Sequence, residues 1–515
     1  MYRTVILWLV PVWIFAVPFT VATYNVENLF DMVYNGTEYP EYIPGKHGWT
    51  KRMAEKKCNH TAQVICDLNA DIIGLQEIEN ETALRALQRR LKRVGCPYPY
   101  GAVTHKKGAA IQVALLSRFP ILHTRELQVS RSPRVRNILE VQVRIRRLLL
   151  TLFVNHWKSK SRKGYESKRI AYAKALQARI AGMNREREYM ILGDLNSNYD
   201  AHLTLPAHLD DTRGRRGLTH ILHTVEGRRL LTEADMVKGR RGIHYDLWEE
   251  LPYPMRWSHN FYGHKSTLDH ILLPSSLFDG KGIDYVNGTF RVFRRGYLFT
   301  KRGTPNHWQI KGGKHRGRGY SDHLPIVAQF DTVPYRIGSD TPLKKKLPST
   351  IESLYRTEKL SHPLLLKNMV VVLKRGRYAV IKGSAGGRGI FVYGSGELLK
   401  EGRRYDLLAK EINRYHGLKE ITAFSVLQER GTETLAPFYA SLGCSRQNEV
   451  LHNIQGVYRN GFFYTEGKKM AIYFKKRHIT PPNGSKLKIT YAHLGYYKKL
   501  QLVVYSRKDF KILEK

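Results

Sequence analysis

The sequence predicts an α/β fold over its first 335 residues, followed by a mostly β C-terminal region. From about residue 19 to 335, short β-branched apolar runs alternate with segments of helical periodicity. From residue 336 onward, glycine punctuates stretches of β pattern, and little sustained helical pattern remains. Positive charge is also denser after residue 336 than before it. Together these observations indicate two regions of different construction.

Five buried strands and three helices are expected in the α/β region. Apolar runs predict the strands Phe19–Val26, Asp71–Leu75, Val113–Leu116, Leu148–Val154 and Tyr189–Leu192. Periodicity of about 3.6 residues predicts the helices Lys51–Leu68, Glu81–Val94 and Lys163–Met183.

The C-terminal region is expected to be a module that binds a polyanion. It holds 34 Lys+Arg and 14 Asp+Glu, a net charge of +20 over 180 residues, whereas the other 335 residues carry +21. A weak internal echo relates residues 402–421 to residues 484–502, each of which reads as strand, turn with tyrosine, strand. The expected parts are a basic linker, 336–362, and two small β barrels, 363–446 and 447–515. Both barrels resemble oligonucleotide/oligosaccharide-binding (OB) barrels. A single irregular β domain is the alternative.

The whole chain is strongly basic, with 85 Lys+Arg against 44 Asp+Glu and a formal net charge of +41. Its 42% hydrophobic and 25% charged residues exclude a wholly disordered chain and an integral membrane bundle. A positive field of this size favours nucleic acid or an anionic membrane as the partner. An ordinary solvated surface is the alternative explanation of the charge.

The N-terminal residues have the pattern of an export signal. Met1–Arg3 is a short basic start, and the apolar run Thr4–Phe19 is too short and too proline-interrupted for a comfortable membrane span. We therefore expect residues 1–18 to be a signal peptide, or else an uncleaved N-terminal anchor, and the protein to be secreted or periplasmic.

Cysteine is scarce, with four residues at positions 58, 66, 96 and 444. This number is too small for a disulfide framework, and the spacing does not match a zinc site. In an exported protein one pair can oxidise, and Cys66–Cys96 is the pair that we expect. Buried free thiols are the alternative.

Polar side chains follow the apolar runs at five places along the α/β region. The motifs are Thr23–Phe30 (TYNVENLF), Asp71–Ile78 (DIIGLQEI), Phe153–Lys160 (FVNHWKSK), Ile191–Asn198 (ILGDLNSN), and the pair Thr267–Leu272 (TLDHIL) and Tyr320–Pro325 (YSDHLP). Buried strands that finish in Glu, Asp, Asn and His place these groups together at one sheet edge. Carboxylate and amide oxygens suit Mg²⁺, with Mn²⁺ or Ca²⁺ as alternatives. Any one motif alone is more often a turn or a structural histidine, but five in this order are a strong signal.

The ordered set resembles the endonuclease/exonuclease/phosphatase superfamily, the DNase I-like fold, over residues 19–335. Within it, Val154–Lys160 and Leu268–Leu272 look most like the bacterial secreted nucleases. The resemblance implies a four-layered α/β sandwich of two packed sheets, with the active site at their common edge.

By this resemblance, Glu77 is the principal metal ligand, Asn25 and Glu27 assist it, and Asp322 completes the metal site. His323, oriented by Asp269, takes a proton from the attacking water, which Asp194 holds. His156 faces the scissile phosphate and either protonates the leaving oxygen or stabilises the developing charge. The expected phosphate contacts are Asn155, Asn196, Lys158 and Arg118.

Two departures from the family pattern affect these roles. Thr267 occupies the position where many relatives have arginine, two residues before Asp269. In addition, no carboxylate is evident that would support His156.

The implied function is a secreted, Mg²⁺-dependent nuclease that acts on DNA, with RNA as a further substrate. The alternatives are a phospholipid phosphodiesterase and a polyanion-binding surface protein without catalysis. Nucleic acid is the expected partner, an anionic membrane is a less expected one, and no obligate protein partner is evident.

Overall fold

The structure is a computed structural model of the chain. It describes residues 17–332 and 350–514, apart from 162–163, 185–186, 262, 359, 361–363 and 395–397. Most of the expected export segment and of the expected linker therefore lies outside the described residues. Within these ranges, no helix combines the length and apolar character needed to cross a membrane. The chain divides into two compact units, one for the α/β region and one for the C-terminal region with the short segments Gly227–Arg229 and Leu251–Arg256.

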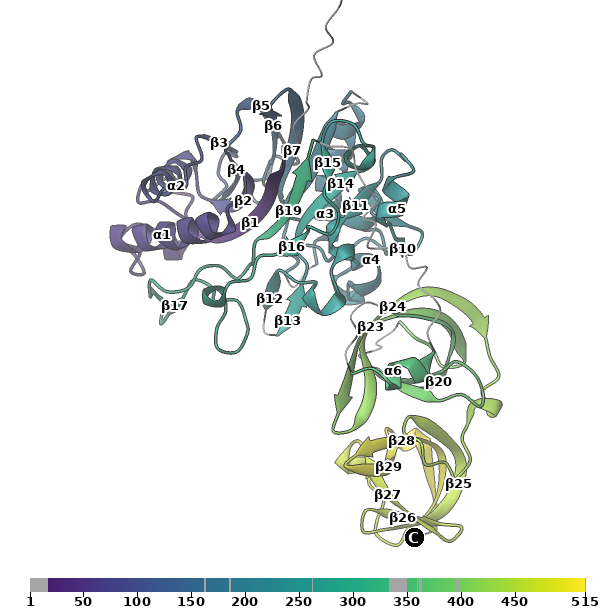
Figure 1. The fold of residues 1–515 in the computed structure, drawn as a ribbon. Helices are drawn as coiled ribbons and strands as arrows, with labels where there is room; N and C mark the ends of the chain where they lie inside the picture. The colour runs from purple at the N-terminus through teal and green to yellow at the C-terminus, as the bar shows by residue number, and fades with distance from the viewer. Residues whose placement is uncertain are drawn as a thin grey trace, which may run out of the picture. The chain divides into compact units, whose positions relative to one another are not determined.

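Two mixed β-sheets pack face to face in the first unit (Figure 1). The first sheet has the order β15 (Asp284–Tyr285), β19 (Ile326–Asp331), β1 (Phe19–Leu29), β2 (Ile72–Ile78), β4 (Gln112–Ser117) and β3 (Tyr100–Val103), and β16 (Arg291–Val292) also pairs with β19. The second has the order β11 (His244–Asp246), β14 (Asp269–Pro274), β8 (Glu188–Asp194), β7 (Leu148–His156), β6 (Ile138–Ile145) and β5 (Ile121–Leu127). At Gly74 on β2, a Cβ atom would lie 2.3 Å from Leu192 Cδ1 on β8, so glycine allows the two sheets to approach closely.

Helices cover the outer faces of both sheets and complete four layers. Helices α1 (Lys51–Leu68) and α2 (Glu81–Arg93) lie on the first sheet, and α3 (Glu166–Ala181) lies on the second (Figure 1). α1 ends at Asn69, which adopts the left-handed conformation, and α2 begins after Asn80, whose side chain accepts a hydrogen bond from Ala83 N at 2.9 Å. The sequence prediction of a four-layered α/β sandwich is confirmed, although α3 is shorter at both ends than expected.

The loops of this unit contain only short elements. They include α4 (Ala201–Thr204), α5 (Glu233–Met236), and the strand pairs β9 (Val225–Glu226) with β10 (Arg229–Leu230), β12 (His259–Phe261) with β13 (His264–Ser266), and β17 (Ile310–Lys311) with β18 (Lys314–His315).

A disulfide joins Cys66, near the end of α1, to Cys96, just after α2, with the two Cα atoms 5.9 Å apart. The predicted pairing is confirmed, and Cys58 and Cys444 are free thiols.

The C-terminal region forms two closed five-stranded barrels, as predicted (Figure 1). The first has the order β20 (Leu364–Arg375), β21 (Tyr378–Lys382), β22 (Gly389–Tyr393), β24 (Leu418–Thr432) and β23 (Arg403–Tyr415). The second has the order β25 (Glu449–Arg459), β26 (Phe462–Thr465), β27 (Lys468–Phe474), β29 (Lys499–Val504) and β28 (Lys486–Tyr497), with β30 (Phe510–Glu514) beside β28. In each barrel the third and fifth strands pair in parallel. The internal echo in the sequence corresponds to the hairpin of the fourth and fifth strands in each barrel.

The expected linker is partly structured. Residues 351–355 form helix α6 (Ile351–Tyr355), and its Ile351 and Leu354 pack in the core of the first barrel. The sequence placed these residues in the linker because a five-residue helix is too short to show periodicity.

Apolar and ionic contacts join the two barrels. A mixed core cluster contains Val380 and Phe391 from the first barrel and Val450 and Val503 from the second. A buried ion pair of 2.8 Å links Lys382 on β21 to Glu449 on β25. An unpaired charge at this buried position would be costly. The ion pair therefore favours the placement of the two barrels in which Lys382 meets Glu449.

Candidate active site

Strand order brings the predicted motifs to one edge of the two sheets. β1 pairs in parallel with β2, and β7 pairs in parallel with β8, so the C-terminal ends of these strands share an edge. β14 runs antiparallel to β8 and begins there, with Asp269 opposite Asp194. His323 lies just before β19, whose first residue, Ile326, pairs with Thr23 on β1. All five motifs therefore contribute to one site.

Irregular backbone aims the carboxylates of β1 and β2. The register shifts between Asn25 and Leu29 on β1, and between Gln76 and Ile78 on β2. Glu27 and Glu77 occupy these bulges with φ of 54° and 65°. Left-handed φ is unfavourable for a glutamate, and such strain clusters at functional sites because bulges redirect side chains.

A carboxylate holds the imidazole of His323. Nδ1 of His323 lies 2.8 Å from Asp269 Oδ2, which also accepts a hydrogen bond from Ser258 Oγ at 2.6 Å. Nε2 of His323 faces Asp194 Oδ2 at 3.9 Å. Burial alone would lower the pKa of His323, but the charges of Asp269 and then Asp322 outweigh it and hold this pKa well above its usual value.

Glu77 lies in the centre of the edge. Its Oε1 accepts a hydrogen bond from Asn25 Nδ2 at 3.1 Å, and its Oε2 accepts one from Asn28 N at 3.0 Å. Asn25 Nδ2 also donates to Asp194 Oδ2 at 3.2 Å, which links the two sheets. Burial, followed by the charge of Asp322, raises the pKa of Glu77 to about 7. A carboxylate destabilised in this way by a second carboxylate fits a position that a divalent cation would neutralise.

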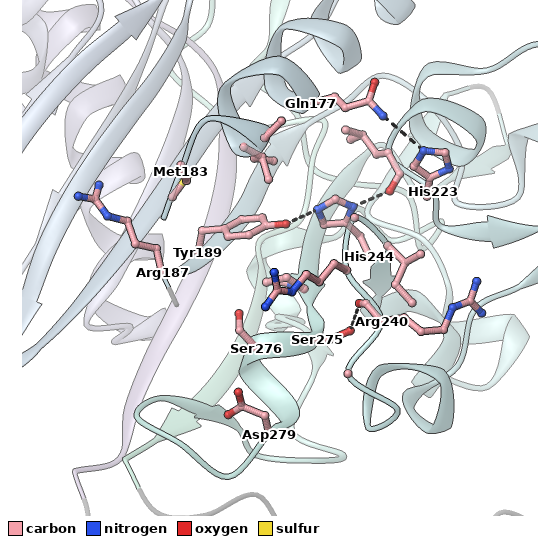
Figure 2. A pocket seen from close by; sticks show the side chains of 18 of the residues that line it. Gln177, Met183, Arg187, Tyr189, His223, Arg240, His244, Ser275, Ser276 and Asp279 are labelled. Atoms are coloured by element: carbon pink, nitrogen blue, oxygen red, sulfur yellow. Dashed lines mark hydrogen bonds between the residues drawn. The ribbon is translucent and has the colours of Figure 1, made fainter. Parts of the chain in front are cut away.

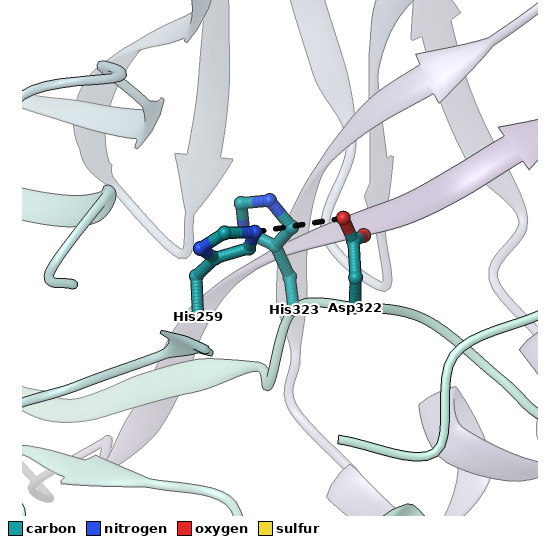
Figure 3. A group of neighbouring side chains, drawn as sticks. All are labelled: His259, Asp322 and His323. Carbon is teal, nitrogen blue, oxygen red and sulfur yellow. Dashed lines mark ion pairs between the residues drawn. The ribbon is translucent and has the colours of Figure 1, made fainter. Parts of the chain in front are cut away.

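Glu27 and Asp322 flank Glu77. Glu27 Oε2 accepts a hydrogen bond from Trp308 N at 2.8 Å, and burial followed by the charge of Asp322 raises its pKa. Asp322 Oδ2 lies 3.6 Å from His259 Nε2 (Figure 3). His259, Asp322 and His323 are one of two groups of described residues whose ligand atoms lie close enough to hold a metal ion, the other being Asp194, Asp269 and His323.

His156 faces the same carboxylates. Its Nε2 lies 3.5 Å from Asp194 Oδ2 and 3.8 Å from Glu77 Oε1. Burial, followed by the charge of Arg136, holds the pKa of His156 well below its usual value. Its Nδ1 is buried and has no hydrogen-bond partner among the residues that the structure describes, in line with the sequence, which offered no supporting carboxylate.

Two of the four predicted phosphate contacts lie beside His156. Asn196 donates from its backbone N to Asp194 Oδ1 at 2.8 Å and from Nδ2 to Trp157 O at 3.1 Å. Lys158 is half-buried, and burial followed by the charge of Arg136 lowers its pKa.

The other two predicted phosphate contacts are corrected by the structure. Asn155 is fully buried, and its amide group bonds Phe153 O at 2.8 Å and Trp157 Nε1 at 2.9 Å, so it supports the strand end instead of binding a ligand. Arg118 follows β4, which runs antiparallel to β2, and therefore lies at the opposite end of the sheet. There it forms an ion pair with Asp71 at 3.3 Å.

Three residues with basic side chains lie at the site and were missed in the sequence. His259 precedes the site strand β14 by ten positions, and Arg136 donates to His156 O at 3.2 Å from the loop before β6. Lys57 on α1 is fully buried, donates to Tyr320 O at 2.6 Å, and has a pKa lowered to about 8 by burial. Of the three, only Arg136 could have been placed at the site from the sequence. It precedes β6, and residues just before a strand antiparallel to β7 must lie near the C-terminal end of β7.

A separate cavity lies away from this edge. It has a volume of about 750 Å³ and is lined by residues such as Tyr189, His244 and Arg240 (Figure 2). Tyr189 stands near the start of β8 and Asp194 at its end, so the cavity and the strand-end groups occupy opposite ends of the strand. The fully buried His244 is engaged by Tyr189 Oη at 2.9 Å and by Leu222 O at 2.5 Å, which gives it a structural role.

Comparison with known proteins identifies the family. The model of the Endonuclease/Exonuclease/phosphatase family matches residues 20–332, and the chain belongs to this family of phosphoester hydrolases, which typically depend on a divalent metal. No match was found among curated proteins.

Several solved structures match the chain at low sequence identity. They include D. rerio TDP2 complexed with single strand DNA product (14% identity, 61% of this chain, 98% of that chain, TM-score 0.38). Truncated Caenorhabditis elegans TDP2 also matches, with 15% identity over 61% of this chain and 97% of that chain and a TM-score of 0.37. The mannosyl-6-phosphatase of Bacteroides thetaiotaomicron matches with 16% identity over 61% of this chain and 99% of that chain and a TM-score of 0.38.

Proposed function

We propose that the protein is an exported, divalent-metal-dependent phosphodiesterase that cleaves DNA, with RNA as a further substrate. The observation that carries the proposal is the His323–Asp269 pair, 2.8 Å apart, which faces Asp194 at the edge that also holds Glu77. The net charge of +41 supports a polyanionic substrate, since such a charge attracts and holds nucleic acid.

Glu77 and Asn25 would hold the metal, with Glu27 and Asp322 beside them. These are oxygen donors, so Mg²⁺ is the expected ion, with Mn²⁺ or Ca²⁺ as alternatives. Bound there, the ion would neutralise charge on the phosphodiester as it is attacked.

His323 is proposed as the general base. Asp269 fixes the imidazole through Nδ1 and leaves Nε2 directed toward Asp194. A cation bound beside Asp322 would offset part of the negative charge that raises the pKa of His323, and this would leave Nε2 able to accept a proton from the attacking water. Asp194 is itself held by Asn25 and by the backbone of Asn196, so that its carboxylate orients the water without moving.

His156, Asn196, Lys158 and Arg136 are proposed to contact the phosphate. His156 Nε2 faces the same space as Asp194 and Glu77, where it can donate a hydrogen bond to a phosphoryl oxygen. The Arg136 guanidinium and the Lys158 ammonium add positive charge on its flank. Hydrogen bonds of this kind, aimed at developing charge, typically contribute 10²–10³-fold to a rate.

The two C-terminal barrels are proposed to be OB barrels that hold the polyanion. Numbered along the chain, the strands of each barrel have the order 1-2-3-5-4, closed between the fourth and the first. The positive charge of this region, +20 over 180 residues, favours phosphate contacts.

A substrate and metal panel tests the proposal. The purified full-length protein is incubated with plasmid DNA, with RNA and with lipid vesicles, each in Mg²⁺, Ca²⁺ or EDTA. We expect DNA cleavage that EDTA abolishes. The His323→Ala variant is run in parallel to show that the activity belongs to this site. Turnover of lipid alone would contradict the nuclease proposal and support the phospholipid alternative.

A further inference from the structure

We propose that the cleft between the two C-terminal barrels binds unpaired nucleotides of a single strand, by stacking their bases on tyrosine side chains. The cleft has a volume of about 940 Å³ and is lined by both barrels. This inference rests on the proposed function for the class of its ligand, but it concerns a different unit of the protein and is tested without catalysis.

Four tyrosines that line the cleft are unusually exposed. The exposed fractions are 37% for Tyr393, 57% for Tyr415, 48% for Tyr473 and 46% for Tyr497. They come from both barrels, on β22, β23, β27 and β28. Single exposed aromatic residues are ordinary, but several around one concave surface indicate a ligand that covers them.

Positive groups lie among these rings. The guanidinium of Arg377 lies 4.5 Å from the ring centroid of Tyr393, and Lys475 Nζ lies 5.1 Å from that of Tyr378. Both cations line the cleft, and Glu420 is the single carboxylate among the described residues that do so. Aromatic faces beside cations match the two parts of a nucleotide, since the base stacks and the phosphate pairs with the positive charge.

The floor of the cleft is fixed before any ligand binds. The rings of Phe391 and His493, one from each barrel, stack with centroids 5.1 Å apart and an interplanar angle of 5°. His493 is held further by Tyr505 Oη at 2.9 Å and by Asn448 Oδ1 at 3.0 Å. A rigid floor lowers the entropic cost of ordering a ligand.

One wall is built from the two hairpins that the internal echo relates. His416, at the turn between β23 and β24, packs 4.6 Å from the ring of Tyr497, near the turn between β28 and β29. A Cβ at Gly417 would lie 2.4 Å from the ring of Tyr496, so glycine is required for the turns to meet. Since each barrel supplies one turn, the wall exists only when both barrels are present.

Unpaired bases explain this lining better than the alternatives. A duplex stacks its bases internally and presents phosphates to a protein surface, so exposed aromatic rings would contribute little to binding it. A neutral oligosaccharide would stack on tyrosines but carries no anion to pair with the charges of Arg377 and Lys475.

Binding is tested with the full-length protein in EDTA, which prevents cleavage. Fluorescence anisotropy measures the Kd for a labelled oligothymidylate of about 15 nucleotides and for a duplex of about the same length. We expect the double variant Tyr415→Ala/Tyr497→Ala to bind the single strand at least ~10-fold more weakly, because two base-stacking contacts are lost. Duplex binding should change by less than about 2-fold, because it depends on phosphate contacts.

Two control variants accompany this test. Tyr464→Ala removes a tyrosine of similar exposure, 38%, on β26 outside the cleft, and it should leave both Kd values unchanged. Tyr415→Phe/Tyr497→Phe keeps the aromatic faces and should retain single-strand binding. Thermal melting confirms that each variant is folded.

Three outcomes would overturn the inference. They are an unchanged single-strand Kd in the double alanine variant, an equal loss of single-strand and duplex binding, and displacement of the oligonucleotide by a neutral oligosaccharide such as chitohexaose. Failure of the proposed function is seen separately, because a wild-type protein that binds the single strand but cleaves no nucleic acid would contradict the nuclease activity alone.

Discussion

The strand-end site of the first unit and the cleft of the second differ in almost every respect. At the site, buried Asp, Asn and His side chains converge with Glu77 on one sheet edge, and the backbone is strained at Glu27 and Glu77. In the cleft, exposed tyrosines from both barrels line one surface, and their aromatic ring faces are the groups proposed to contact a ligand. A site made at strand ends therefore leaves an ordered set of motifs in the sequence, whereas a site made by packing two domains does not.

The first prediction separates cleavage from binding. His323→Ala should reduce nucleic-acid cleavage by at least about 10²-fold, because the proposed proton acceptor is lost. Single-strand binding in EDTA should stay the same, since the cleft is untouched. Steady-state cleavage rates and anisotropy measure the two properties. The control is His123→Ala, an exposed histidine on β5, with no expected change. Near-normal cleavage by the His323 variant would refute its role.

A second substitution addresses the metal. Glu77→Gln should cut cleavage at limiting Mg²⁺ by about 10-fold or more, with partial recovery at high Mg²⁺, because one anionic ligand is removed. Titrating Mg²⁺ against cleavage rate measures the shift, and calorimetry measures the metal affinity directly. Glu81→Gln, an exposed residue in an i,i+4 pair with Arg85, is the matched control. An unchanged Mg²⁺ dependence would remove Glu77 from the metal site.

The third prediction compares the loss of Arg136 with the loss of Arg118. Arg136→Ala should slow cleavage by about 10-fold or more, since a positive donor beside His156 is lost. Arg118→Ala should leave the rate unchanged and cost at most about 1 kcal/mol of stability, because its ion pair with Asp71 is partly exposed. Cleavage rates and thermal unfolding of both variants provide the test. The reverse order of effects would contradict the placement of the site.

A smaller effect concerns salt. Lys475→Ala should reduce the slope of log K against log salt for single-strand binding by about one, as expected for the loss of one phosphate contact. Anisotropy titrations at several salt concentrations measure the slope. An unchanged slope would mean that Lys475 makes no phosphate contact.

The last prediction concerns how the stability of the barrels depends on pH. Burial lowers the pKa of His493 to about 3, whereas an unfolded histidine titrates near 6.5. The unfolded chain therefore binds the extra proton first, so His493 stabilises the barrels above pH ~6.5 and this contribution falls as the pH drops toward about 3. Calorimetry of the C-terminal unfolding transition from neutral to acid pH should show this loss, and His493→Gln should flatten it. An equally steep pH dependence in the variant would exclude His493 as its source.

Much of the first unit could be predicted because its signals are local. Helix α1 has the bounds that its periodicity predicts, and the strand-end motifs do converge at one edge. Arg118 and Asn155 were misassigned because sequence position does not reveal which end of an antiparallel strand a residue occupies, or whether an amide is already satisfied. His259 was missed because it lies on a long loop that folds back to the site, and residue spacing in the sequence does not predict where such a loop goes.

The cleft could not be predicted for a different reason. Aromatic residues are 11% of the whole chain, and the C-terminal region has 20 in its 180 residues, so composition gave no sign of enrichment. What matters is that tyrosines of two separate barrels face each other, and this depends on the Lys382–Glu449 pair and the apolar contacts around it. The internal echo of the hairpins was visible, but their contact through His416 and Tyr497 was not.

The left-handed residues at the strand ends imply a trade-off between durability and turnover. Glu27 and Glu77, at the two bulges, have φ of 54° and 65°, and such conformations cost of order 1–3 kcal/mol each. Selection for heat resistance alone would therefore favour glycine at these bulges. Glycine would relieve the backbone strain but would remove the carboxylates. Heat-hardened variants of this protein should accordingly be screened for cleavage as well as for melting temperature, since its most effective stabilising changes coincide with its most damaging ones.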